Sequence, residues 1–348
     1  MTLSSNGHLG EDPDRPTPDG ESDRPPPRPG ASVFTIEGRA APGLFVVGWL
    51  ASILGLSLAV IGVLGGSTIL AFFVGPGLLS LGLIAGAGNQ ALERRARGEP
   101  YAGPSPFIVF GAIVAVSYFI GALLGVVLEG LFAAAGVEVA GPIGQLIGGL
   151  LTAAVFLAVI RLTVVGTGAL SWSEMGLRPF DRTAVSQLAT GAAFAVPVIA
   201  ITAVVGLVLV TIFGVVSPSP LPPTGQLSGL FVQLLAGAIV APIAEEIVFR
   251  GFAITAWRRT IGEQRAVVRA ALLFALAHVV AVEAGSFGEA IGLIAVGIGT
   301  RLPVAWALGV LFVRTGSLWA PIGLHAVFNG LLLTLAHLAL TSGTAPVG

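Results

Sequence analysis

The sequence contains no cysteine and no lysine, and only 10% of its 348 residues are charged. The lack of cysteine excludes disulfide bonds, thiolate metal sites and cysteine nucleophiles. The net charge of −1 provides no basic excess, so we expect no nucleic-acid partner. A soluble domain usually has about 25% charged residues. With 55% hydrophobic residues and a mean hydropathy of +0.94, most of this chain is not expected to face water.

Residues 1–42 differ in composition from the rest of the chain. The stretch 10–30 (GEDPDRPTPDGESDRPPPRPG) is rich in Pro, Asp and Arg and has no large apolar residue. Such a segment cannot bury enough apolar surface to offset the entropy lost on ordering. We therefore predict a disordered cytoplasmic tail over residues 1–42.

Long apolar stretches recur from residue 44 onward, each close to the roughly 20 residues that a helix needs to cross a bilayer. They predict an all-α polytopic membrane protein with about nine transmembrane helices (eight or nine), near 44–64, 68–90, 107–134, 143–165, 187–216, 228–253, 268–284, 290–313 and 318–340. The stretch 268–284 is the least typical of the nine, because it is short and has Glu283 at its end.

Arginine occurs in alternate connections between these stretches. The arginines are Arg94, Arg95 and Arg97, then Arg178 and Arg182, then Arg258, Arg259, Arg265 and Arg269, and last Arg314. Positive residues stay on the cytoplasmic side during insertion. The pattern predicts a cytoplasmic N-terminus, and with nine spans an external C-terminus. We expect a multi-pass protein of the plasma membrane, with lipid as its surroundings.

Ionisable residues inside a bilayer cost at least about 2.5 kcal/mol, so each one is a candidate functional residue. In this sequence they gather in the C-terminal third, within AEEIVFRG (Glu245, Glu246, Arg250), FALAH (Phe274, His278) and HAVFN (His325, Asn329). Counted from the nearest arginine-bearing connection at 1.5 Å per residue, the first glutamate and the two histidines lie at a similar depth of roughly 14–20 Å.

The spacing of these residues along a helix indicates which side chains share a face and what each could do. Glu246 and Arg250 are four residues apart and can form an ion pair, whereas Glu245 points elsewhere and can face a cavity. A free carboxylate beside an imidazole can accept a proton from water as a general base. His325 and Asn329 share a helix face and can donate hydrogen bonds to an oxyanion. Zinc held by Glu245, His278 and His325 could activate the water instead, so the cofactor question stays open.

The three motifs E-E-x-x-x-R, F-x-x-x-H and H-x-x-x-N, in this order on successive apolar stretches, resemble those of the CPBP intramembrane proteases, also called the Abi family or type II CAAX prenyl endopeptidases. The resemblance covers roughly residues 170–340. It implies a glutamate-dependent endopeptidase whose site lies in a cytoplasm-facing cavity. Glu245 and His278 would activate water, His325 and Asn329 would form the oxyanion hole, and Glu246, Arg250 and Phe274 would support the site.

We therefore divide the sequence into a tail (1–42), N-terminal transmembrane helices (43–165), a CPBP-like protease core (166–340) and a C-terminal tail (341–348). The expected substrate is a membrane-anchored peptide or protein, prenylated or not. Two other functions stay open. One is a non-catalytic immunity or scaffold protein that binds a partner in the membrane. The other is a proton-coupled transporter, because Glu and His relays are common in such proteins.

Overall fold

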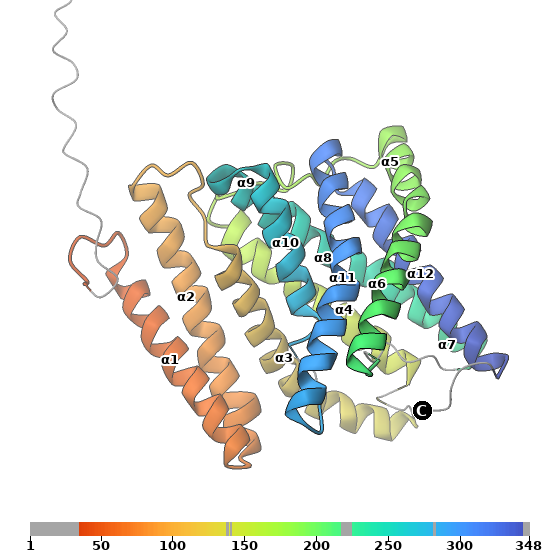
Figure 1. Ribbon diagram of the computed structural model, residues 1–348. Helices are drawn as coiled ribbons and strands as arrows, with labels where there is room; N and C mark the ends of the chain where they lie inside the picture. Colours follow the sequence, from red (N-terminus) through yellow and green to blue (C-terminus); the bar gives the residue numbers. More distant parts are fainter. Residues whose placement is uncertain (1–34, 137–138, 140, 217–224, 281–282, 344–348) are drawn as a thin grey trace, which may run out of the picture. The chain divides into compact units, whose positions relative to one another are not determined.

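The computed structural model of the protein describes residues 35–136, 139, 141–216, 225–280 and 283–343 (Figure 1). Within these ranges the regular structure is entirely helical, and residues 40–348 form one compact unit. Most of the tail predicted over 1–42 lies outside the described residues, and the first helix begins at Pro42. The predicted C-terminal tail is described only as far as residue 343.

Eight helical segments in the described part of the chain are long and apolar enough to cross a membrane, which confirms a polytopic all-α protein with eight or nine spans. The first four segments are α1 (Pro42–Leu64), η1 (Ile69–Val74) with α2 (Gly75–Ala96), α3 (Pro106–Ala135), and α4 (Pro142–Ile160) with η2 (Arg161–Val165). The labels η1 and η2 denote π-helical turns that continue the neighbouring α-helices.

The other four segments lie in the C-terminal half. They are α5 (Arg182–Ala193) with α6 (Ala195–Phe213); a composite segment of α7 (Leu227–Leu234), η3 (Leu235–Val240), α8 (Ala241–Glu246), η4 (Ile247–Ile254) and α9 (Thr255–Ile261); α11 (Phe287–Thr315); and α12 (Trp319–Thr341). Between α9 and α11 lies α10 (Glu263–Ala277).

The predicted span 268–284 is the one that the structure changes. Its helix, α10, has 15 residues, about 22 Å at 1.5 Å per residue, against a hydrocarbon thickness of about 30 Å. The helix also begins five residues before the predicted span, in charge-rich sequence with Glu263, Arg265 and Arg269 in its first half. Even so, α11 begins at the end of the helical unit opposite α9, so the chain still changes ends between them (Figure 1).

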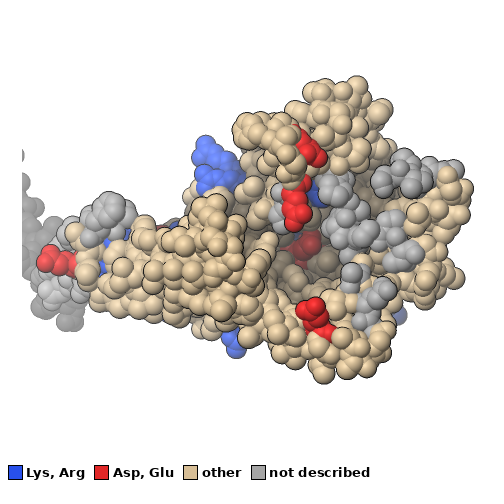
Figure 2. Space-filling view, turned by 90° about the horizontal axis from the view of Figure 1, so that it is seen from below, with Lys and Arg blue, Asp and Glu red and all other residues tan. Residues whose placement is uncertain are grey.

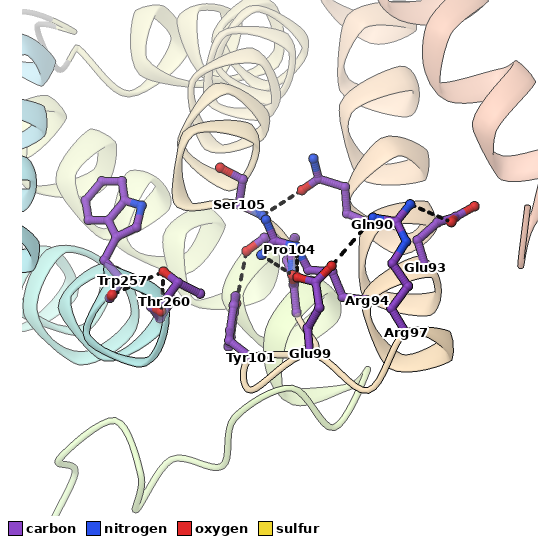
Figure 3. A network of polar contacts seen from close by, with 12 residues as sticks. Gln90, Glu93, Arg94, Arg97, Glu99, Tyr101, Pro104, Ser105, Trp257 and Thr260 are labelled. Carbon is purple, nitrogen blue, oxygen red and sulfur yellow. Dashed lines mark hydrogen bonds and ion pairs between the residues drawn. The ribbon is translucent and has the colours of Figure 1, made fainter. Parts of the chain in front are cut away.

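The arginine-bearing connections gather at one end of the helical unit. Figure 1 shows the α2–α3, α4–α5, α9–α10 and α11–α12 connections at the same end, and the connection that follows α1 at the other. This arrangement is the one that alternating arginines predict. At the α2–α3 connection the cations are paired locally: Arg97 lies 3.2 Å from Glu93, and Arg94 lies 3.5 Å from Glu99 (Figure 3).

The packed core joins the C-terminal helices to α3 and α4. Phe249 and Phe252 of η4, Phe274 of α10 and Phe312 of α11 are all buried in one apolar cluster. By contrast, α1 and α6 leave many large apolar side chains exposed, as expected of helices that face lipid. The core therefore surrounds the segment that carries the two adjacent glutamates.

Helices α5 and α12 approach each other closely through glycine. A Cβ atom on Gly191 of α5 would overlap the carbonyl oxygen of Ala320 in α12, and a Cβ on Gly323 would overlap the carbonyl oxygen of Leu188. Such approach requires residues without a side chain, as is common where membrane helices pack. It fixes the position of α12, which carries His325 two residues after Gly323.

We expect Gly191→Ala to destabilise the protein by about 1–3 kcal/mol, because the added methyl group forces α5 and α12 apart. Thermal unfolding in detergent would measure the loss. Gly148→Ala in α4 is the matched control, since its Cβ would meet no atom within 4 Å. Equal stability of the two variants would contradict the close approach.

Glu174, in the α4–α5 connection, joins that connection to α9. Its carboxylate accepts hydrogen bonds from Arg259 at 2.7 Å and from the backbone N–H of Ser171 at 2.7 Å. The Arg259 hydrogen bond, followed by those from Ser171, lowers the pKa of Glu174 from 4.5 to about 2.

A carboxyl group with a lowered folded-state pKa adds stability above its unfolded pKa, and this stability is lost as the pH falls towards the folded value. We therefore expect the stability difference between wild type and Glu174→Gln to be largest above pH 4.5 and to vanish towards pH 2. The effect should be small, because both partners are partly exposed. Thermal unfolding across this pH range measures it, and a pH-independent difference would contradict it.

Candidate active site

The composite segment 227–261 changes its helical winding on either side of the two glutamates. The π-helical turn η3 precedes the short α8, which ends at Glu246, and the π-helical turn η4 follows it. Single π-helical turns inside α-helices occur often at functional sites. Here they set the directions in which Glu245, Glu246 and Arg250 leave the segment.

Pro242 leaves one backbone carbonyl of this segment without its helical hydrogen-bond donor. In η3 the N–H of Ala241 donates to the carbonyl of Ala236, five residues back. The next donor in that pattern would be residue 242, but proline has no N–H, so the carbonyl of Gly237 is left free. Asn329 of α12 fills this position, with its amide nitrogen 2.8 Å from the Gly237 oxygen. One of the two amide hydrogens is thereby used, and the second remains available.

Glu246 is the centre of a buried polar network. Its Oε1 atom accepts a hydrogen bond from Arg250 at 2.9 Å, so the ion pair expected from the sequence is present. The same oxygen lies 2.7 Å from Nδ1 of His325. The exposed fractions of Glu246, Arg250 and His325 are 0%, 1% and 3%, which removes all three from solvent. A shared carboxylate thus links the composite segment to α12.

Arg250 extends this network to two further helices. Its guanidinium donates to the carbonyl oxygen of Ala305 in α11 at 3.2 Å. It also lies 4.5 Å from the centre of the Phe274 ring of α10, a favourable cation–π contact. One buried cation therefore connects the composite segment to both α10 and α11.

His278 stands at the end of α10, with Nδ1 2.8 Å from the backbone oxygen of Phe274. A carbonyl oxygen only accepts, so Nδ1 carries the proton and Nε2 of the neutral ring is left as an acceptor. The rings of His278 and His325 lie 4.5 Å and 5.7 Å from the Phe274 ring. Phe274 therefore gives an apolar surface to both imidazoles.

Glu245 is the carboxylate without a fixed partner. Its side chain is 20% exposed, and its Oε2 atom forms no hydrogen bond within the described part of the protein. Oε2 lies 3.8 Å from Nε2 of His325, too far for a direct hydrogen bond. Glu245 also interacts electrostatically with His278. Both histidines thus lie near a carboxylate group that has one oxygen without a hydrogen bond in the described part of the protein.

The three residues considered for zinc do not form a ready ligand group. No cluster of three or more His, Asp or Glu side chains among the described residues is arranged to hold a metal ion. His278 and His325 each use Nδ1 on a protein acceptor, which leaves one nitrogen apiece. Metal-binding histidines usually have such a hydrogen bond at the other ring nitrogen, so Nε2 of each ring remains able to bind a metal.

Arg301 of α11 is the site residue that the sequence did not assign. Glu283 and Glu289 are the acidic residues that precede it most closely in the sequence. Within the described residues it forms no ion pair; its guanidinium donates to Gly297 of its own helix at 2.8 Å and interacts electrostatically with Glu245. Glu289 instead accepts from the N–H of Gly285. The signal in the sequence was a charge in the middle of a span.

The helical unit is hollowed at the end opposite the arginine-bearing connections. Figure 2 shows this end, with acidic side chains around the hollow and inside it. If the arginine-bearing end is cytoplasmic, as predicted, this hollow opens to the other side of the membrane. Its direction differs from the cytoplasm-facing cavity that the family resemblance implies.

Residues 227–331 match the family model described as Type II CAAX prenyl endopeptidase Rce1-like. The match lies inside the predicted core 166–340 and includes all seven residues of the three motifs, together with Arg301. No curated protein and no solved structure matches the chain. The family resemblance is therefore confirmed for this segment.

We expect Glu246→Gln to destabilise the protein by about 3–5 kcal/mol, because it leaves the buried Arg250 cation without its counter-charge. Glu263→Gln is the matched control. Glu263 lies 3.9 Å from Arg258 in an exposed pair, and such pairs contribute about 0–1 kcal/mol. Thermal unfolding of the two variants in detergent compares them, and a similar small loss in both would show that the buried pair contributes little.

Proposed function

We propose that this chain, in which residues 227–331 belong to the Rce1-like family of type II CAAX prenyl endopeptidases, is an intramembrane endopeptidase that uses Glu245 as its general base. The expected substrate is a membrane-anchored peptide or protein, and the expected location is the plasma membrane. One observation carries the proposal: the unpartnered Oε2 of Glu245 faces Nε2 of a histidine that is itself held by a buried carboxylate.

The first step is the activation of water. A water molecule beside Glu245 and Nε2 of His278 gives a proton to the Glu245 carboxylate, and its oxygen attacks the carbonyl carbon of the peptide bond. Glu245 then passes the proton to the leaving amine as the carbon–nitrogen bond breaks. The carboxylate regains its charge, so one water is consumed and no other reactant is needed.

The second requirement is stabilisation of the negative oxygen that forms during attack. Nδ1 of His325 is directed to Glu246, so Nε2 can donate a hydrogen bond only when the ring carries both protons. The amide hydrogen of Asn329 that Gly237 does not use is the second donor. Together they supply the type of interaction that is often largest in acyl transfer.

The test is cleavage of fluorogenic peptides, prenylated and unmodified, by the purified protein in detergent. We expect Glu245→Gln and His278→Ala to lower kcat/KM by about 10²–10⁴-fold, the range for loss of general acid–base catalysis. Asn329→Ala should cost up to about 10²–10³-fold, as for one oxyanion donor. Glu263→Gln, the same chemical change at an exposed site at the start of α10, should leave the rate unchanged.

A chelator is added in parallel, and we expect activity to persist. If wild type and Glu245→Gln give the same background with every peptide, the endopeptidase proposal fails and partner binding in the membrane becomes the better function. Loss of activity on chelation, restored by zinc, would instead assign the water activation to a metal.

A further inference from the structure

Arg301 occupies a position where an unneutralised charge is expensive. It lies in the middle of α11, 14 residues and thus about 21 Å from either end of the helix. Its printed hydrogen bond goes from one guanidinium nitrogen to Gly297 of its own helix. The other donors of the planar fork have no acceptor within the described residues. A charge held in this way needs water or an anionic ligand.

The packing of α11 places Arg301 at the level of the two glutamates. The composite segment 227–261 and α11 run in the same direction, each towards the arginine-bearing end (Figure 1). They touch where Arg250 donates to the oxygen of Ala305. Four residues back along each helix, one turn from that contact, are Glu246 and Arg301. Arg301 therefore lies beside the glutamates, on the side away from the arginine-bearing connections.

The neighbours of Arg301 indicate which chemical group it could bind. It interacts electrostatically with both Glu245 and His278, so it belongs to the same site. Yet the guanidinium and Glu245 are not within ion-pair distance, and Glu245 is needed as a base. A guanidinium with free donors fits a carboxylate through two parallel hydrogen bonds, which a lysine ammonium cannot form.

We propose that Arg301 binds a carboxylate of the peptide substrate and so determines which bonds are presented to Glu245. This inference rests on the proposed endopeptidase function, because the carboxylate belongs to the peptide that is cut. The carboxylate can be the C-terminal group of the peptide or an Asp or Glu side chain close to the scissile bond. Arg301 is therefore a specificity-determining residue, not a structural counter-ion for Glu245.

The experiment compares three otherwise identical fluorogenic peptides: a free C-terminal acid, its C-terminal amide, and an amide with Asp near the scissile bond. Each is cleaved by wild type, Arg301→Gln, Arg301→Lys and Arg314→Gln. We expect wild type to prefer a carboxylate-bearing peptide over the plain amide by about 10–100-fold in kcat/KM, as for one charge-assisted bidentate contact. Arg301→Gln should abolish this preference, so that the kcat/KM values for the acid, the Asp peptide and the plain amide become similar.

Arg314→Gln removes an exposed arginine of the same helix and should keep the full preference. Arg301→Lys keeps the charge but loses the fork and should restore only part of it. The acid and the Asp peptide distinguish the two sources of the carboxylate. If Arg301→Gln lowers cleavage of all three peptides equally, the arginine acts on Glu245 and the proposal is wrong.

Binding provides a readout that does not depend on cleavage. Fluorescence anisotropy with Glu245→Gln, and with Glu245→Gln combined with Arg301→Gln, measures the affinity for acid and amide. Selective binding of the acid that requires Arg301 would support this inference even if wild type cleaved nothing, a result that would overturn the endopeptidase proposal alone. Equal affinity for acid and amide in both proteins would overturn the carboxylate site.

Discussion

The site depends on one buried carboxylate oxygen, Oε1 of Glu246, which holds both Arg250 and His325. An isolated charge at this depth would be strongly unfavourable, and each member of the group is acceptable only because the others are present. Through Arg250 the group also reaches the backbone of α11 and the Phe274 ring of α10. Four separate helical segments are thus fixed relative to one another by a single acceptor.

The adjacent glutamate, Glu245, is not part of this buried group. Two consecutive carboxylates leave a helix in different directions, so the pairing of Glu246 with cations has no counterpart at Glu245. The first carboxylate is therefore available for proton transfer, while the second orients a histidine that faces it at 3.8 Å. Adjacent residues of the same type have different tasks because only one of them points into the packed core.

Backbone chemistry supports the same division of tasks. Pro242 removes a donor from the helix just before the glutamates, and Asn329 satisfies the carbonyl that is left free. The asparagine is consequently fixed in position while it keeps one amide hydrogen for a ligand. Positioning and function are combined in a single side chain, so loss of Asn329 would affect both.

The helical class, the alternating arginine pattern and the seven motif residues could all be predicted from the sequence, because hydrophobic length and charge inside apolar segments are local properties. The sequence also predicted the Glu246–Arg250 pair, which depends only on the spacing along one segment. It overestimated the helix at 268–284, because apolar composition alone does not show where α10 begins among charged residues or ends at His278.

The contacts between polar side chains of different helices could be seen only in the tertiary structure. The contact of His325 with Glu246, the acceptor for Asn329 and the place of Arg301 beside Glu245 all join residues that are more than 50 positions apart. Such contacts depend on the packing and relative level of separate helices, which no local pattern encodes. A buried charge is stabilised by partners on other helices, whereas the apolar residues that allow a helix to cross the membrane all lie within that helix.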